Sequence, residues 1–397
     1  MTSKKDLIIK WHNSIQDICE ADWVRLNYEC KNPFYKWNWL NLLEKSGSIS
    51  PKYGWQPLYL SITRKNKPIA CAPLYLKGHS FGEFIFDHQF VDLAKILEVN
   101  YYPKLIGMSP LSPVEGYRFL FAPNEDKEYL TKLIIKAIDD FCIKNEILSC
   151  NFLYVDSEWQ LLAEKAGCAK WLNINSMWNA GNAKDFSCYL ESFNANQRRN
   201  IKRERNSIKK SNLKISVKSG SDINTAMMRS MYKFYEKHCA RWGPWGSKYL
   251  SENFFVELAS SNLKDQIILF IATKNDSRKP IAMSMFLRNE NMLWGRYWGS
   301  EVEINNLHFE LCYYSPIEWA LKKGIKSFDP GAGGSHKRRR GFIARPQVSM
   351  HKWYNTKMDT LIRQWLPQVN KLISEEIKAT NNEVPFKKNQ PKLSLME

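Results

Sequence analysis

Two pairs of apolar segments, far apart in the chain, share the same pattern of hydrophobic and polar positions. In each pair a mostly apolar run reaches a short polar tip and continues into a second apolar run, which is typical of an antiparallel β-hairpin. The first hairpin is expected over residues 57–76 and the second over residues 266–287. Both return strands open with the same four residues, Lys-Pro-Ile-Ala, at 67–70 and 279–282. We therefore predict a duplicated structural unit.

The segments that follow the two hairpins support the duplication. Each hairpin is later followed by an amphipathic pattern with helical spacing, at 128–144 and 306–323, and then by a short apolar run, at 150–155 and 325–328. Strands mixed with helices in this order predict an α/β (α+β) protein with two mixed sheets flanked by helices. We place the two halves at 1–190 and 191–379. The polar, proline-interrupted end, 380–397, is expected to be disordered.

A basic helix is predicted at the start of the second half, within the segment 192–210. Ile201 and Ile208 are seven residues apart and form one narrow apolar edge. Four cations share another face of this helix: Arg198, Lys202, Arg205 and Lys209. This face is either a solvated surface or a contact for a polyanion such as nucleic acid.

The composition favours a globular protein with anionic partners. The 397 residues include 44% hydrophobic residues, and 58 Lys and Arg face 40 Asp and Glu, which gives a formal charge of +18. A genome rich in Lys codons would produce the same excess. The nine cysteines never form a Cys-x-x-Cys motif, so neither a disulfide framework nor a metal site is expected. Without a signal-peptide pattern or a membrane-length apolar run, we expect a cytoplasmic protein.

A glycine-rich loop with a basic continuation is the strongest candidate for ligand binding. Residues 328–342 read Phe-Asp-Pro-Gly-Ala-Gly-Gly-Ser-His-Lys-Arg-Arg-Arg-Gly-Phe and follow a predicted strand. Glycines allow close approach of the backbone to a ligand, and the cations that follow suit an anionic substrate. The predicted substrate-binding residues here are Gly331, Gly333, His336, Lys337 and Arg340. The alternative is a solvated turn with a charge run behind it.

A second group of candidates lies on the strand 293–299 and on the helix after it. Two glycines within this strand indicate a bulge or a close approach. His308 and Glu310 are two positions apart and point to different sides of a helix, so they cannot chelate one metal ion together. We expect Glu310 to hydrogen-bond Tyr313 or Tyr314. No hydrolase elbow, nucleotide-binding loop, dinucleotide fingerprint or zinc-protease motif is present.

Six ordered motifs between residues 32 and 353 resemble the bacterial FemAB-like "peptidoglycan biosynthesis/recognition" family. They are Lys77-Gly-His-Ser-Phe-Gly-Glu-Phe-Ile-Phe-Asp87, Tyr101-Tyr-Pro-Lys-Leu, Pro110-Leu-Ser-Pro-Val-Glu-Gly, Arg296-Tyr-Trp-Gly, Leu307-His-Phe-Glu-Leu-Cys-Tyr-Tyr314, and the loop from Gly331 to Phe342. The family belongs to the tandem GNAT-type (Gcn5-related) acyltransferases.

The resemblance implies transfer of an acyl or aminoacyl group to an amine, for example that of a cell-wall precursor. The donor would be aminoacyl-tRNA or acyl-CoA, with no cofactor bound permanently. The usual GNAT pyrophosphate loop should fall at 300–306. Here the stretch reads Ser-Glu-Val-Glu-Ile-Asn-Asn, which lacks glycine and carries two carboxylates, so it argues against the common mode of CoA binding.

Within that chemistry the candidate roles are assigned by position. Glu310 or Asp87 is the predicted base, and Tyr297 or Tyr313 the predicted acid. Lys104, Arg296 and His308 are added to the substrate-binding set. We expect replacement of Lys337 to weaken anion binding without lowering the melting temperature. The alternative function is a non-catalytic protein that binds RNA or a phosphorylated precursor; the oligomeric state stays open.

Overall fold

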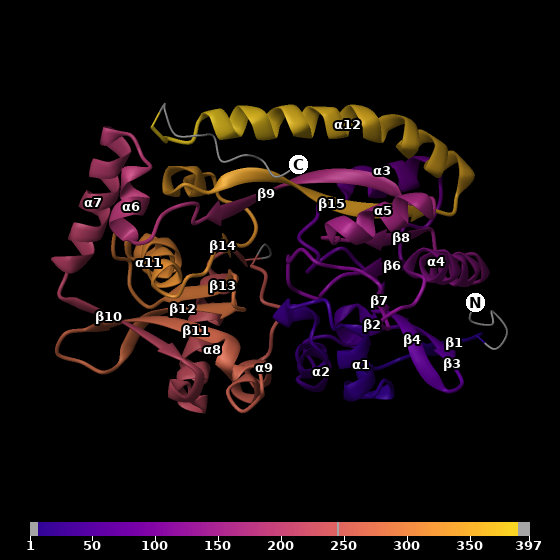
Figure 1. Ribbon diagram of the computed structural model, residues 1–397, viewed down its shortest axis with the longest axis horizontal. Coiled ribbons are helices and arrows are strands. Elements are labelled where there is room, and N and C mark those ends of the chain that lie inside the picture. Colours follow the sequence, from indigo (N-terminus) through magenta and orange to yellow (C-terminus); the bar gives the residue numbers. More distant parts are fainter. Residues whose placement is uncertain (1–6, 244–245, 388–397) are drawn as a thin grey trace. The chain divides into compact units, whose positions relative to one another are not determined.

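The computed structural model describes residues 7–243 and 246–387. The chain divides into two compact units, each with strands and flanking helices (Figure 1). The first unit consists of Met1–Asn173 and Pro346–Glu375, and the second of Ile174–Arg345 and Glu376–Glu397. The predicted mixed α/β class is confirmed.

The two units are not the contiguous halves expected from the sequence. Strand β15 (Ile343–Trp353) returns to the first unit, where it pairs antiparallel with β8 (Ser149–Phe152), and the long helix α12 (Thr356–Asn382) follows it. The chain enters the second unit within β9 (Ala169–Asn179), before residue 190. Long-range strand pairing decides this boundary, and no local pattern reveals it.

Part of the predicted disordered tail is ordered. Helix α12 extends to Asn382, and Phe386 forms an antiparallel bridge with Phe193 in the second unit. The Asn381 side chain exchanges two hydrogen bonds with the backbone of Ala344. Residues 388–397 lie outside the described part of the chain.

The first unit contains two groups of strands. One is the antiparallel order β1-β3-β4-β7, and the other is β2-β5-β6-β8-β15, in which β6 and β8 are parallel. The strands not yet introduced are β1 (Leu7–His12), β2 (Trp55–Pro57), β3 (Tyr59–Arg64), β4 (Lys67–Ala72), β5 (Tyr75–Lys77), β6 (Lys104–Gly107) and β7 (Leu120–Phe121). The helices of this unit are α1 (Glu20–Leu26), α2 (Trp37–Lys45), α3 (His88–Ile96), α4 (Lys127–Lys144) and α5 (Ser157–Lys165).

The second unit has the strand order β10-β11-β12-β13-β14-β9, in which only the pair β13 and β14 is parallel among the described pairings. Its strands are β10 (Leu213–Ser219), β11 (Ile267–Lys274), β12 (Pro280–Arg288), β13 (Met292–Ser300) and β14 (Ser327–Asp329). Its helices are α6 (Phe186–Glu191), α7 (Ala195–Lys209), α8 (Thr225–Ala240), α9 (Glu252–Leu258), α10 (Leu307–Phe309) and α11 (Ser315–Lys322), with a π-helical turn at Glu310–Tyr314.

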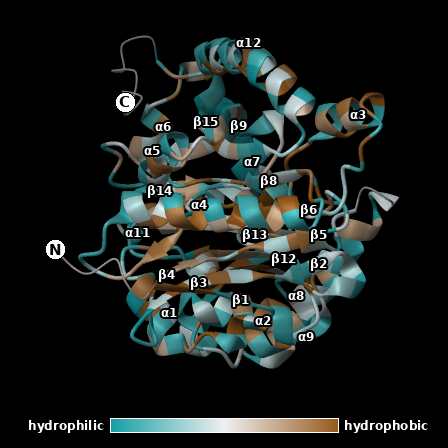
Figure 2. Ribbon diagram, turned by 90° about the vertical axis from the view of Figure 1, so that its right-hand side faces the viewer, coloured by the Kyte–Doolittle hydropathy of each residue, from teal (hydrophilic) through white to brown (hydrophobic). Residues whose placement is uncertain are grey.

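Helices cover both faces of the central strands in the second unit. Figure 1 shows α8 and α9 on one side of β11–β13 and α11 on the other. Strand β11 is consequently buried at six successive positions, as its continuous apolar sequence predicts. Figure 2 shows the same distribution by colour, with apolar residues concentrated on strands and polar residues on outer helix turns.

The predicted repeat is confirmed down to one irregular residue in each hairpin. The register of β3 with β4 shifts between Ile62 and Thr63, and the register of β11 with β12 shifts between Ala272 and Thr273. In both cases the isoleucine of Lys-Pro-Ile-Ala is the extra residue of a β-bulge. The carbonyl of each isoleucine then accepts a hydrogen bond from a neighbouring strand end, from Ala122 (2.9 Å) and Glu301 (2.8 Å), respectively.

The helix and strand after each hairpin also correspond. Residues 145–148 join α4 to β8, and residues 323–326 join α11 to β14, so the connections have equal length. One difference between the copies is the connection after the hairpin. Strands β12 and β13 are joined by residues 289–291, whereas the equivalent strands β4 and β7 are separated by residues 73–119. The first unit therefore carries an insertion, which contains β5, α3 and β6.

Candidate functional site

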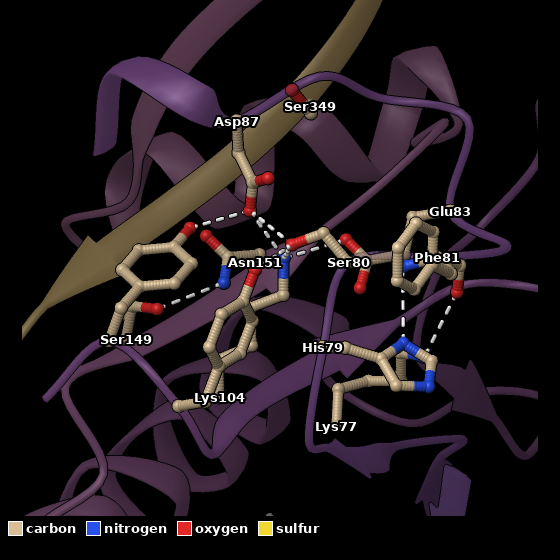
Figure 3. A network of polar contacts seen from close by, with 12 residues as sticks. Lys77, His79, Ser80, Phe81, Glu83, Asp87, Lys104, Ser149, Asn151 and Ser349 are labelled. Carbon is tan, nitrogen blue, oxygen red and sulfur yellow. Dashed lines mark hydrogen bonds and ion pairs between the residues drawn. The ribbon is translucent and has the colours of Figure 1, made fainter. Parts of the chain in front are cut away.

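A buried group of charged side chains lies within the insertion of the first unit (Figure 3). At its centre Lys104, the first residue of β6, is 1% exposed. Its ammonium group donates to Glu83 Oε2 (2.7 Å), Asp87 Oδ2 (2.5 Å) and Ser80 Oγ (2.8 Å). All three ammonium hydrogens are thereby used.

The two carboxylates respond differently to this environment. Burial raises the pKa of Glu83 above its usual value, although Lys104 opposes the change. Burial alone would also raise the pKa of Asp87. The charge of Lys104 and hydrogen bonds from Lys104, Tyr101 and Ser80 hold the pKa of Asp87 below its usual value. Asp87 is therefore an anchored anion, since a carboxylate with three donors on one oxygen is a weak base.

A second lysine lies beside this group. Lys77, at the end of β5, is fully buried, with its ammonium nitrogen 3.8 Å from the centre of the Trp55 ring. It donates to the Phe81 carbonyl (3.0 Å) and lies 3.2 Å from Nδ1 of His79. Burial lowers the pKa of Lys77 to about 7, and the nearby carboxylates only partly oppose this. Lys77 therefore changes charge near neutral pH.

A hydrogen-bonded chain of uncharged side chains adjoins the same group. His351 of β15 contacts Asn151 Oδ1 through Nδ1 (2.7 Å) and Ser349 Oγ through Nε2 (2.8 Å). Asn151 in turn donates to Ser149 (3.1 Å), and Figure 3 shows Ser149, Asn151 and Ser349 around the charged group. Burial, assisted by Lys104, lowers the pKa of His351 to about 3, so this imidazole is neutral at physiological pH.

The structure thus brings two predicted residues, Asp87 and Lys104, into one cluster. Sequence reasoning missed the site role of Lys77, Ser80 and Glu83, although all three lie in the motif at 77–87. One signal could have found them: the motif at 77–87 directly follows an apolar strand and still contains several charged residues. Their side-chain contacts come from the loop 78–87 folding over β6, which no periodic pattern indicates.

The second unit holds a separate group around the predicted glycine loop. Strand β13 bulges at Arg296, as the glycines predicted, and β13 pairs with β14 only over Met292–Trp294. The Arg296 guanidinium forms a buried ion pair with Asp329 (2.9 Å). Asp329 also accepts the Gly331 N–H (2.8 Å), and Lys337 donates to the Gly331 carbonyl (2.6 Å). These contacts fix the loop beside the bulge.

Lys337 and Arg340 are buried, which differs from a solvated cationic run. Lys337 is 3% exposed, and burial lowers its pKa to about 8. Arg340 lies with its guanidinium carbon 3.4 Å from the centre of the Phe309 ring and forms an ion pair with Glu204 (2.7 Å). Both cations therefore hold the loop in place. From the sequence we expected replacement of Lys337 to leave the melting temperature unchanged; with the side chain buried, we now expect the replacement to lower it.

Two predicted residues, Tyr313 and His336, meet beside this loop. The Tyr313 hydroxyl lies 2.7 Å from His336 Nε2, and the ring of His308 is 5.6 Å from that of Tyr313 and 5.7 Å from that of His336. Burial, followed by the charges of Arg340 and Lys337, lowers the pKa of His336 to about 4. Burial lowers the pKa of His308 to about 3 and raises that of Tyr313. The group is uncharged at physiological pH.

Glu310 does not bond Tyr313 or Tyr314, so that expectation is wrong. Arg205 of α7 donates to both Glu310 oxygens (3.2 and 2.9 Å) and also contacts Glu318 (2.8 Å). Ser315 donates a further bond to Glu310 (2.8 Å). A buried carboxylate occupied in this way anchors α7 to the π-helical turn and is poorly placed to act as a base.

The remaining candidates are distributed over other contacts. Tyr297 packs its ring against those of Tyr235 (5.4 Å) and Phe255 (5.6 Å). On α7, Lys202 and Lys209 are exposed and Arg198 is half-buried, while Arg205 turns inward to its carboxylate partners. The predicted four-cation face therefore loses one member; α7 exposes two further cations, Arg199 and Arg203.

The stretch after β13 forms a turn that uses its own polar groups. Ser300 Oγ accepts the Val302 N–H (3.2 Å) and donates to the Val302 carbonyl (2.7 Å), which ties the turn to itself. Glu301 and Glu303 lie 3.6 Å from Lys279 and Arg241, respectively. An amide already used within the turn and two carboxylates beside it make a poor pyrophosphate site.

Metal-ligand clusters and membrane-spanning helices are both absent from the described residues. Within 7–243 and 246–387, no group of three or more His, Cys, Asp or Glu could hold a metal ion. In the same residues, no helix combines the length and apolar character needed to cross a membrane.

Among solved structures, several align with this chain at low sequence identity. FemX aligns with a TM-score of 0.50 and 10% identity, covering 90% of this chain and 100% of its own. L-PGS from Bacillus licheniformis aligns with a TM-score of 0.48 and 10% identity over 82% of this chain and 95% of its own. A tandem GNAT protein from the clavulanic acid biosynthesis pathway aligns with a TM-score of 0.43 and 8% identity, over 88% and 99% of the two chains.

No curated protein matches the sequence. The family model described as "Peptidogalycan biosysnthesis/recognition" matches residues 14–388, nearly the whole chain. Because this match spans nearly the whole chain, the chain belongs to this FemAB-like family.

Proposed function

We propose that this protein is an N-acyltransferase that moves an aminoacyl or acyl group from an activated ester or thioester to an amine. The family and the tandem GNAT-type fold support this class of reaction. The observation that carries the proposal is the geometry of β13. This strand pairs with β14 only as far as Trp294, bulges at Arg296, and so separates from β14 next to the Gly331 loop. Backbone N–H groups of a strand that parts from its neighbour can stabilise an oxyanion.

In this proposal His336 and Tyr313 handle the proton. The amine nitrogen attacks the carbonyl carbon, and its proton passes through the Tyr313 oxygen, while the tyrosine proton moves to His336 Nε2. The imidazole, with a pKa of about 4, is neutral at physiological pH, so its Nε2 can accept the hydrogen of the Tyr313 hydroxyl. Once protonated it is a strong acid, so the proton returns readily to the departing oxygen or sulfur as the carbonyl bond to the leaving group breaks.

The proposed donor is aminoacyl-tRNA in preference to acyl-CoA. The 300–306 turn uses its own amide and carries Glu301 and Glu303, which disfavours a CoA pyrophosphate. Helix α7 of the same unit exposes cations that form no ion pair among the described residues: Arg199, Lys202, Arg203 and Lys209. Such a face suits the phosphates of an RNA donor.

The test is transfer of radiolabel to a panel of primary amines. Wild-type protein is incubated with tRNA charged with labelled amino acids or with labelled acetyl-CoA, and labelled amide is separated and counted. We expect transfer from charged tRNA, and a loss of roughly 10²–10⁴-fold in His336→Phe and in Tyr313→Phe. Lys323→Ala, at an exposed position of the same unit, is the matched control. Absence of amide from both donors would refute the proposal.

A further inference from the structure

The turn that carries His336 lies between two glycines with a left-handed backbone. Gly334 has a φ of 91° and Gly341 a φ of 76°, and the tight helical turn Ser335–Arg340 separates them. Glycine loses more backbone freedom on folding than any other residue, so ordering a turn between two glycines is costly. The position of His336 relative to Tyr313 therefore depends on contacts with other elements.

Helices α6 and α7 supply such contacts. Tyr189 of α6 donates to the Arg340 carbonyl (3.1 Å), and Gln197 of α7 donates to the Arg339 carbonyl (2.7 Å). Seven residues after Gln197, on the same face of α7, Glu204 accepts from the Arg340 guanidinium (2.7 Å). This face lies opposite the exposed cations of α7, and it is occupied by the turn.

Arg340 connects Glu204 to the backbone of His336. Its Nη2 donates to Glu204 Oε2, and its Nη1 donates to the His336 carbonyl (2.9 Å). The buried guanidinium also lies flat against Phe309, with its carbon 3.4 Å from the ring centre. Because the guanidinium is planar and its donors have fixed directions, holding one nitrogen and one face leaves the other nitrogen little freedom. The place of the Glu204 carboxylate thus determines where the His336 backbone lies.

The same carboxylate oxygen also holds the segment of Tyr313. Glu204 Oε2 accepts the hydroxyl hydrogen of Tyr314, which is fully buried and directly follows Tyr313 in the π-helical turn. One oxygen therefore joins the segment of Tyr313 to the turn of His336. The Tyr313 hydroxyl and His336 Nε2 lie 2.7 Å apart, and a displacement of about 1 Å would break their hydrogen bond.

We propose that Glu204 is a positioning residue for the His336–Tyr313 pair, which it keeps at hydrogen-bond distance by binding Arg340 on one side and Tyr314 on the other. This inference rests on the proposed function, because the pair handles the proton there. Glu204 acts through its two partners and takes no part in the proton transfer itself. The inner face of α7 thereby becomes part of the transfer site.

The pKa of His336 reports how far its ring is kept from water. Burial is the main cause of its value of about 4, and the charges of Arg340 and Lys337 in the same turn add to the effect. Tyr313 and His308 face the ring from the π-helical turn and from α10, and both are uncharged at physiological pH. A displaced turn therefore changes this pKa mainly through hydration.

Loss of the Glu204 charge and displacement of the turn shift this pKa in opposite directions. With the turn in place, Glu204→Gln leaves the Arg340 cation without its counter-charge, which lowers the pKa of His336 further. An unpaired buried guanidinium is unfavourable, so Arg340 should move toward water and draw the turn with it. Hydration then raises the pKa toward about 6.5, the ordinary value for histidine. Since burial is the largest cause of the low value, we expect the rise to prevail.

The experiment follows His336 by nuclear magnetic resonance in the full chain, with labelled histidine side chains and no acyl donor. The chain has seven histidines, and the His336 signal is the one missing from His336→Phe. In wild type we expect this signal to stay at its neutral position from about pH 5.5 to about pH 8, and in Glu204→Gln to titrate within this range. A His336 signal that does not titrate in folded Glu204→Gln would overturn the proposal.

Two further variants complete the test. Tyr314→Phe keeps the ion pair of Arg340 but frees the segment of Tyr313, so the Nε2 signal of His336 should shift; if Glu204→Gln fails to fold, an unshifted signal in Tyr314→Phe overturns the proposal instead. The control is Glu318→Gln, which removes an ion pair between α11 and Arg205 of α7 (2.8 Å). The His336 signal of the control should match wild type, and equal changes in the control would contradict the assignment.

Transfer from charged tRNA gives a second readout. Glu204→Gln should lower kcat by roughly 10²-fold, because a misplacement of about 1 Å can cost that much. The KM for charged tRNA should stay the same, since the exposed cations of α7 are untouched. Transfer by wild type with an unchanged kcat in the variant would sink this inference alone. Titration of His336 as expected, with no transfer by wild type, would count against the proposed function alone.

Discussion

At the scale of single residues, the structure turns four of the candidate cations inward. Arg205, Arg296 and Arg340 each reach a carboxylate, and Lys337 reaches a carbonyl. A run of basic residues carries no sign of which members turn inward, because that depends on carboxylates contributed by distant segments. The buried cations hold the Gly331 loop and α7, so they shape the second unit before any ligand is bound.

Lys337→Met should lower the stability of the second unit by about 1–3 kcal/mol, because the change leaves the Gly331 carbonyl without its donor while keeping a similar side-chain volume. Urea unfolding followed by tryptophan fluorescence measures the difference. Lys323→Met is the control, since Lys323 is exposed and should shift the midpoint little. Equal midpoints for wild type and Lys337→Met would mean that the hydrogen bond contributes nothing.

At the scale of elements, the duplicated hairpins show how a short sequence fixes a local irregularity. Proline cannot donate to the ladder, and in both copies the residue after it, Ile69 or Ile281, forms the bulge. Helix α7 shows the opposite limit. Its periodicity gives the helix and its buried edge, Ile201 and Ile208, but not the partner of each cation.

Reversing Lys202 and Arg203 to Glu should weaken binding of tRNA and lower its salt dependence. Both side chains are exposed on α7. For single-stranded RNA, each phosphate contact that is lost reduces the magnitude of the slope of log affinity against log salt by about 0.7. Filter binding at two salt concentrations measures the slope. Lys357→Glu with Lys371→Glu, exposed on α12, changes the net charge equally and serves as control. Equal weakening in the two double variants would show only a general charge effect.

At the scale of the whole molecule, the first unit is built from two distant parts of the chain. Strand β15 pairs with β8 from Met350 to Trp353, and its aromatic residues complete a cluster with Phe90 and Trp171. The ring centres of Phe90 and Trp353 are 5.3 Å apart. A cut between the predicted halves therefore removes part of the core of the first unit.

A fragment of residues 1–190 should not fold cooperatively by itself, because β8 loses its neighbour and Phe90 loses part of its packing. Adding a fragment of residues 343–387 should restore a cooperative thermal transition in near-ultraviolet circular dichroism. A 343–387 fragment with Trp353→Asp and His351→Asp is the control, and we expect it not to restore the transition. A cooperative transition in residues 1–190 alone would show that β15 is not required.

Features that arise from local pattern could be predicted from the sequence. Strand hairpins, amphipathic helices, the duplication and the bulged strand follow from apolar periodicity and from proline and glycine, whose backbone limits act within a few residues. The six motifs indicated the family, and they contain the candidate residues Asp87, Lys104, Tyr313 and His336. The four residues form two separate groups in different units. This division depends on strand pairing across the chain, which the motifs themselves do not show.

Charge states and burial likewise depend on the tertiary fold. Lys77 has a pKa near neutrality because β5 and the loop 78–87 exclude water from it, and Glu310 is occupied because α7 brings Arg205 to it. Burial and ion pairing arise from segments far apart in the chain, so residue type and spacing cannot give them. The insertion 73–119, which holds the buried charged group around Lys104, was likewise visible only after the two copies could be compared strand by strand.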